Sequence, residues 1–135
     1  MIAALRRHWP EYVMEGALLG LFMISAAGFA TLLEYPGSPV RRAIESAPLR
    51  RVLMGCAMGL TALSLISSPW GQRSGAHMNP ATTLTFLRLG KVDATDALFY
   101  VLAQFTGGVA GLALASAALG APLGSREVSF VATRP

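Results

Sequence analysis

The sequence of 135 residues has few charged residues and a single cysteine. Only 13% of its residues are charged, which is about half the share found in an ordinary soluble domain. The one cysteine, Cys56, excludes a disulfide within the chain and leaves the redox environment open. Because 53% of the residues are hydrophobic, the composition argues against an ordinary soluble domain.

The charge that is present gathers at the ends of three long uncharged runs, which cover residues 16–33, 52–72 and 97–125. Uncharged apolar runs of about 18 residues or more are typical of transmembrane helices. The net charge of +4 comes from arginines such as Arg6 and Arg50 at the ends of these runs. There we expect them to anchor helices at lipid headgroups rather than to bind nucleic acid. The sequence therefore predicts an integral membrane protein that crosses the bilayer several times.

Turn-forming residues divide the chain into three spans and one shorter piece. We expect a polar head at residues 1–11, spans at about 12–33, 49–68 and 94–119, an irregular loop at 35–49, and a tail that ends at Thr133, Arg134 and Pro135. Each span carries two glycines four residues apart, a spacing that favours close packing of membrane helices. These glycines are Gly16 and Gly20, Gly55 and Gly59, and Gly107 and Gly111.

The shorter piece, at about residues 74–89, is too short to cross a bilayer, for which about 20 residues are needed. Asn79 is a strong N-cap and Pro80 suits the first helical position, so a helix is predicted to start here and to end near Gly90. The preceding residues 74–78 would then be non-helical. Such backbone is tolerated at membrane depth only where it is buried in protein or lines a wet cavity. A short helix that merely fills space is the alternative.

The backbone of this piece would suit a pore-lining role. The carbonyl groups of residues 75–78, free of helical hydrogen bonds, would point into a water-filled path, and Asn79 would offer its side-chain N–H groups. The positive end of the helix dipole would repel cations.

The stretch SGAHMNPA at residues 74–81 resembles the first signature loop of the aquaporin and glycerol-facilitator family, the major intrinsic proteins. Gly59-Leu60-Thr61 and Tyr100-Val101-Leu102-Ala103-Gln104 also resemble that family, in its order along the chain. The resemblance implies an all-α membrane protein with three transmembrane helices and one re-entrant half-helix. Residues 1–135 would form a single aquaporin-like repeat. The resemblance further implies a multi-pass protein of the cell membrane, plasma or inner, and a tetrameric assembly.

The resemblance also implies roles for particular residues. Glu15 and Gln104 would hold the loop, although Glu15 has the alternative of an exposed acid at headgroup level. The expected pore-lining residues are Gly75, Ala76, His77, Met78, Asn79, Pro80, Ala81 and Met58. Met58 has the alternative of a lipid-facing or core position. No metal site is expected, because no second histidine, cysteine or acid lies at ligand spacing from His77.

The function implied is a passive channel for water or a small neutral solute such as glycerol, without a cofactor. No residue pattern for catalysis is present, so an enzyme is not expected. One repeat would supply the first half of a pore, which a second half or an inverted second copy would complete. The alternative is a truncated fragment that packs or assembles in the bilayer without conducting. Charge leaves the orientation open, with five basic residues at one end and six at the other.

Overall fold

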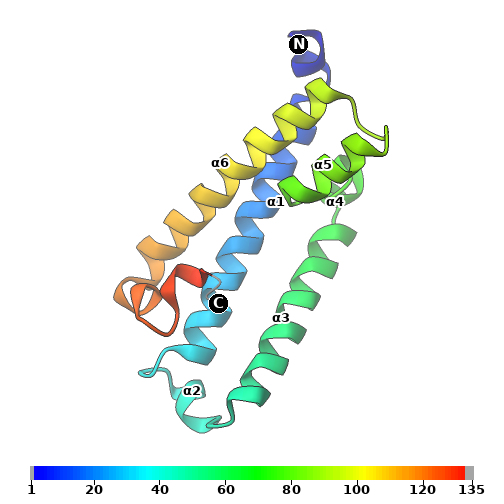
Figure 1. The fold of residues 1–135 in the computed structure, drawn as a ribbon. Helices are drawn as coiled ribbons and strands as arrows, with labels where there is room; N and C mark the ends of the chain where they lie inside the picture. Colours follow the sequence, from blue (N-terminus) through cyan, green and yellow to red (C-terminus); the bar gives the residue numbers. More distant parts are fainter. Residues whose placement is uncertain (1, 133–135) are drawn as a thin grey trace.

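The computed structural model describes residues 2–132, which form a bundle of helices with no β-strand among them (Figure 1). The helices are α1 Ile2–Glu34, α2 Pro39–Ala43, α3 Ala47–Ser67, α4 Pro69–Ser74, α5 Pro80–Arg88 and α6 Ala94–Leu119, followed by the 3-10 helices η1 Ala121–Gly124 and η2 Ser129–Val131. The expected tail residues Thr133, Arg134 and Pro135 lie outside the described residues.

Three helices are long and apolar enough to cross a membrane, namely Leu5–Glu34 of α1, α3 and α6. With 21 residues, α3 rises about 31 Å, which matches a hydrocarbon core of about 30 Å. With nine residues, α5 rises only about 13 Å and cannot cross it. These lengths confirm the predicted fold class, an all-α membrane protein with three transmembrane helices and one half-helix.

Helix α1 begins well before residue 12, where the first span was expected to start, because it is helical from Ile2 and contains Pro10 within it. Contacts with the start of α6 hold the early turns in place. The Tyr12 hydroxyl donates to Asp96 Oδ1 at 2.6 Å, and His8 Nδ1 lies 3.2 Å from the same oxygen. The Tyr12 ring also stacks on Phe99 with ring centroids 5.2 Å apart. Tertiary contacts thus extend the helix beyond its apolar run.

A serine or asparagine followed closely by proline starts four of the helices. The cap residues of α2, α3, α4 and α5 are Ser38, Ser46, Ser68 and Asn79, and each accepts a backbone N–H of the first turn. Proline suits the first turn because no helical partner is available there for its missing N–H. The prediction of a wholly irregular loop over 35–49 is therefore wrong, because its prolines start α2 and α3 instead of only breaking the chain.

Glycines bring α1 and α6 into close contact along their length. A Cβ atom on Gly16 would lie 2.6 Å from the carbonyl oxygen of Ala103, and one on Gly20 would lie 2.8 Å from that of Gly107. Cβ atoms on Gly107 or Gly111 would overlap the α1 backbone. Since any larger residue would push the helices apart, these four glycines set the distance between α1 and α6.

The glycine pair of α3 does not pack as expected, because no atom of residues 2–132 outside the helix's own backbone lies within 4 Å of a Cβ placed on Gly55 or Gly59. Polar contacts join α3 to α1 instead. The hydroxyl groups of Ser25 and Thr61 lie 2.8 Å apart. Near the other end, Arg50 pairs with Glu34 at 3.1 Å.

Arg50 also differs from the headgroup anchor that was expected. It is buried, and its Nη1 atom donates to the carbonyl oxygens of Ile44 at 2.9 Å and Glu45 at 2.8 Å. Arg50 also donates to Glu34, so its guanidinium has acceptors on several sides. The planar guanidinium can bind several acceptors at once because it carries five N–H donors. Arg50 therefore fixes the connection between α1 and α3.

Candidate functional site

The connection between α4 and α5 has an unusual backbone. Gly75 ends α4 with φ at 91°, and Ala76 and Met78 have φ at 47° and 46°. The left-handed region costs a residue with a side chain roughly 1 to 2 kcal/mol. Two such residues within three positions persist only where surrounding contacts hold them.

Glu15 of α1 supplies those contacts, and its side chain has no exposed surface. Four donors reach its carboxylate: Ser74 Oγ at 2.7 Å, the backbone N–H of His77 at 3.0 Å, that of Met78 at 2.7 Å, and Gln104 Nε2 at 2.9 Å. A carboxylate has about four acceptor positions, so these donors use its full capacity. Glu15 thereby fixes the conformation of residues 74–78 from one side.

The carbonyl groups of the same loop point the other way. In a trans peptide unit the N–H and the C=O point in opposite directions, and the described residues contain no cis peptide. The N–H of His77 shares its peptide unit with the carbonyl of Ala76, and the N–H of Met78 shares its unit with the carbonyl of His77. Because both N–H groups bind Glu15, both carbonyls face away from it. Within residues 2–132, no donor binds the carbonyl oxygens of residues 75–78.

Behind the loop, Gln104 and Thr83 form a buried polar network with no exposed surface. Gln104 Nε2 contacts Thr83 Oγ1 at 3.0 Å as well as Glu15. His77 Nδ1 lies 3.0 Å from the same threonine oxygen. The network therefore joins α1, α5, α6 and the loop through side chains that are all satisfied.

The sequence analysis did not identify Thr83 and Tyr100 as residues of the site. Thr83 lies one helical turn after Asn79, on the same face of α5, and Tyr100 lies one turn before Gln104 on α6. The Tyr100 hydroxyl donates to the carbonyl oxygen of Ser74 at 2.9 Å. The spacing of four residues from each predicted site residue was the available signal.

The His77 ring lies parallel to that of Phe86, with centroids 4.8 Å apart. Among the described residues, no group of three or more histidine, cysteine or acidic side chains is placed to hold a metal ion.

Asn79 caps α5 with its side-chain oxygen, which accepts the N–H of Ala81 at 2.8 Å. This bond turns the amide N–H₂ group away from the helix. Asn79 and Ala81 are exposed and Pro80 is half-buried, so the helix start lies open at the bundle surface. Met58 is half-buried on α3, three residues before Thr61 and thus on the side of that helix that carries the contact with Ser25.

An ion pair holds the loop from its exposed end. Arg73, in the last turn of α4, donates through Nε to Glu11 of α1 at 2.9 Å. The Arg73 side chain is 57% exposed, so this pair contributes at most about 1 kcal/mol. Its effect is mainly to position α4 beside α1.

Together, the fold and this loop define an integral membrane protein in which a buried carboxylate holds a non-helical segment at the start of a half-helix. The chain belongs to the family described as Major intrinsic protein, whose profile matches residues 7–133.

Curated relatives agree with this assignment. Aquaporin-1 of Homo sapiens is 32% identical over 108 residues, which cover 80% of this chain and 38% of the relative. Glycerol uptake facilitator protein-like 6 of Lactiplantibacillus plantarum is 32% identical over 99 residues, covering 73% of this chain and 39% of the relative. The lens fiber major intrinsic protein of Lithobates pipiens is 39% identical over 67 residues, or 50% of this chain and 25% of the relative. The chain thus spans about two fifths of the length of the first curated relatives that it matches. No solved structure matches it.

Proposed function

We propose that the protein forms part of a passive membrane channel for water or small neutral solutes such as glycerol, with residues 75–81 along the pore. The observation that carries this proposal is that the N–H groups and the carbonyl groups of the loop point in opposite directions. The N–H groups of His77 and Met78 bind Glu15, and the carbonyl oxygens of Ala76 and His77 therefore face the other way. Within residues 2–132, the carbonyl oxygens of residues 75–78 have no partner. A row of such acceptors replaces part of the hydration of a molecule that passes. Relatives named as an aquaporin and a glycerol uptake facilitator support the proposal.

The start of α5 adds a donor to this row of acceptors. The free N–H₂ group of Asn79 offers hydrogen bonds to the oxygen of water or of an alcohol, and Pro80 and Ala81 place no competing group beside it. The N-terminal end of the helix dipole carries about half a positive charge, which disfavours cations. We further propose that Met58 contributes to the wall from α3, and that Glu15 and Gln104 support the loop without touching solute.

The half-helix lines only part of a transmembrane path, because its rise of about 13 Å is less than half of a hydrocarbon core of about 30 Å. We therefore propose that residues 1–135 form one repeat, and that a second three-helix unit lines the rest of the path. That unit is either further sequence of a longer polypeptide or a second copy of this chain. Without it, the unpaired carbonyls of the loop would face lipid at a cost of several kcal/mol each.

The test uses membrane vesicles from cells that produce the protein and from cells whose gene for it has been deleted. We expect faster shrinkage in a mannitol gradient, or faster swelling in glycerol, only where the protein is present. Asn79→Leu should remove the difference at equal protein level, while Glu127→Gln, at an exposed position, should keep it. Equal permeability with and without the protein would favour the alternative of a fragment that only assembles.

A further inference from the structure

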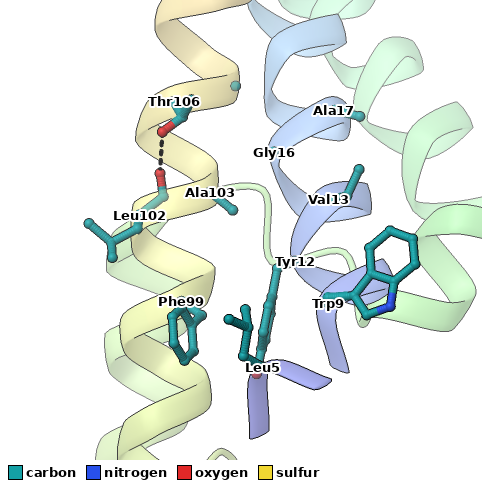
Figure 2. Close-up of a pocket in the computed structure, with 11 residues that line it drawn as sticks. Leu5, Trp9, Tyr12, Val13, Gly16, Ala17, Phe99, Leu102, Ala103 and Thr106 are labelled. Carbon is teal, nitrogen blue, oxygen red and sulfur yellow. Dashed lines mark hydrogen bonds between the residues drawn. The ribbon is translucent and has the colours of Figure 1, made fainter. Parts of the chain in front are cut away.

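An apolar groove runs along the seam between α1 and α6, and none of its lining residues belongs to the network around Glu15 (Figure 2). Its volume is about 500 Å³. The walls come from Leu5, Trp9, Val13, Phe99 and Leu102, and the floor consists of small residues such as Ala17. A second pocket of about 320 Å³ shares part of this floor and continues the groove toward Ile24 and Leu114.

The groove offers almost no free polar group to an occupant. The Thr106 hydroxyl donates to the carbonyl oxygen of Leu102 at 2.8 Å, as Figure 2 shows. The Tyr12 hydroxyl donates to Asp96. An occupant of the groove must therefore be apolar along its length, because a buried polar group there would lack a partner.

The size of the groove decides between two apolar occupants. From Leu5 to Ala17 it extends about 18 Å along α1, slightly more than half of a hydrocarbon core of about 30 Å. Its volume over this length gives a mean cross-section of about 28 Å². A helix with its side chains is about 10 Å wide, or about 80 Å² in section. A single hydrocarbon chain therefore fits into the groove along its length, whereas a helix of a second copy could insert only a row of side chains into it.

A positive charge lies at the end of the groove that is lined by Leu5 and Trp9. Arg6 is three residues from Trp9 and seven from Val13, so it shares the groove face of α1. The Arg6 side chain is exposed, and no carboxylate of residues 2–132 pairs with it in the structure. Trp9, also at this end, is 56% exposed, and tryptophan favours the level of lipid headgroups.

We propose that this groove binds one acyl chain of an anionic phospholipid, whose phosphate pairs with the Arg6 guanidinium. The guanidinium fork matches two phosphate oxygens at once. The small floor residues keep the groove open, and the aromatic walls cover the chain. The phospholipid thus occupies the α1–α6 seam over about one leaflet.

The test measures fluorescence quenching of Trp9 by brominated lipids in phosphatidylcholine vesicles. Of the two tryptophans, Trp70 is exposed and is removed by Trp70→Phe. At equal low fractions, brominated phosphatidylglycerol should quench roughly fivefold more effectively than brominated phosphatidylcholine, the preference expected for one basic residue near the surface. Arg6→Gln should abolish this preference. Arg7→Gln, the matched control with its side chain on another face of α1, should keep most of it.

A second variant, Ala17→Leu, fills the floor of the groove and should weaken quenching by phosphatidylglycerol without changing the unfolding midpoint. Equal quenching by the two lipids would overturn the proposal. Equal effects of Arg6→Gln and Arg7→Gln would also overturn it, because they would indicate diffuse surface charge. Absence of quenching by both lipids would mean that protein covers the groove, from a second copy or from further sequence of the polypeptide, and would overturn it as well.

Discussion

Gln104 donates a hydrogen bond to Glu15 at 2.9 Å, and neither side chain has any exposed surface. The two residues lie 89 positions apart in the sequence. Their contact joins α1 to α6 at the level where the loop before α5 meets both helices. An acid buried among apolar helices is stable only when its neighbours satisfy it, so the loop and the acid depend on each other.

Removing the acid should therefore destabilise the whole bundle. We expect Glu15→Ala to lower the free energy of unfolding by about 3 kcal/mol or more, because several buried donors lose their acceptor at about 1 to 3 kcal/mol each. Thermal unfolding in detergent, followed by circular dichroism, measures the change. Glu127→Ala, at an exposed position, is the control and should stay within about 0.5 kcal/mol of the wild type. Equal midpoints for the two variants would contradict the supporting role of Glu15.

Substitution of glycine by alanine should affect stability differently at Gly107 and at Gly55. Gly107→Ala should destabilise the protein by roughly 1 to 3 kcal/mol, since its Cβ would overlap the Gly16 carbonyl group. Gly55→Ala meets no atom within 4 Å and should be neutral or stabilising by up to about 1 kcal/mol, through helix propensity alone. Unfolding midpoints of the two variants in the same detergent test this. A similar loss at both positions would show that α3 packs closely through Gly55 in solution.

Much of the fold could be predicted because its signals are local. The start of α5 could be predicted from Asn79 and Pro80, because these residues cap and begin a helix through contacts with their neighbours in the sequence. α6 covers Ala94–Leu119, the residues at which the third span was expected, because an apolar run lies between Asp93 and Gly120.

The missed features depend on contacts between distant residues. The N-terminal turns of α1 are helical because Tyr12 and His8 bind Asp96, more than 80 positions away. Thr83 belongs to the candidate site because Gln104 and His77 converge on its hydroxyl group. The spacing of four residues from Asn79 marks the face of α5 on which Thr83 lies, but only these tertiary contacts show that its hydroxyl group is buried in the site.

The proposed re-entrant arrangement of residues 74–89 predicts which positions share a face of the membrane. Figure 1 shows the connection between α5 and α6 at the same end of the bundle as the N-terminus. In a Cys56→Ser background, cysteines at Arg73 and Lys91 should react with an impermeant thiol reagent from one side. A cysteine at Arg41, before α3, should react from the other side, since α1 lies between. Labelling of Arg73→Cys and Lys91→Cys from opposite sides would mean that α5 crosses the membrane.

The purified 135-residue chain alone should not form a selective water pore as a monomer. It contributes one half-helix of about 13 Å, so the rest of a path of about 30 Å lacks a wall and a second dipole end. Stopped-flow shrinkage of liposomes that contain only this chain should match bare lipid. Fast water flow that remains proton-tight would contradict the expectation and would require two copies in opposite orientation. Such a pair would bring two Asn79 side chains together at the centre, so Asn79→Cys in a Cys56→Ser background should then crosslink into a dimer, whereas Arg41→Cys, at the bundle end, should not.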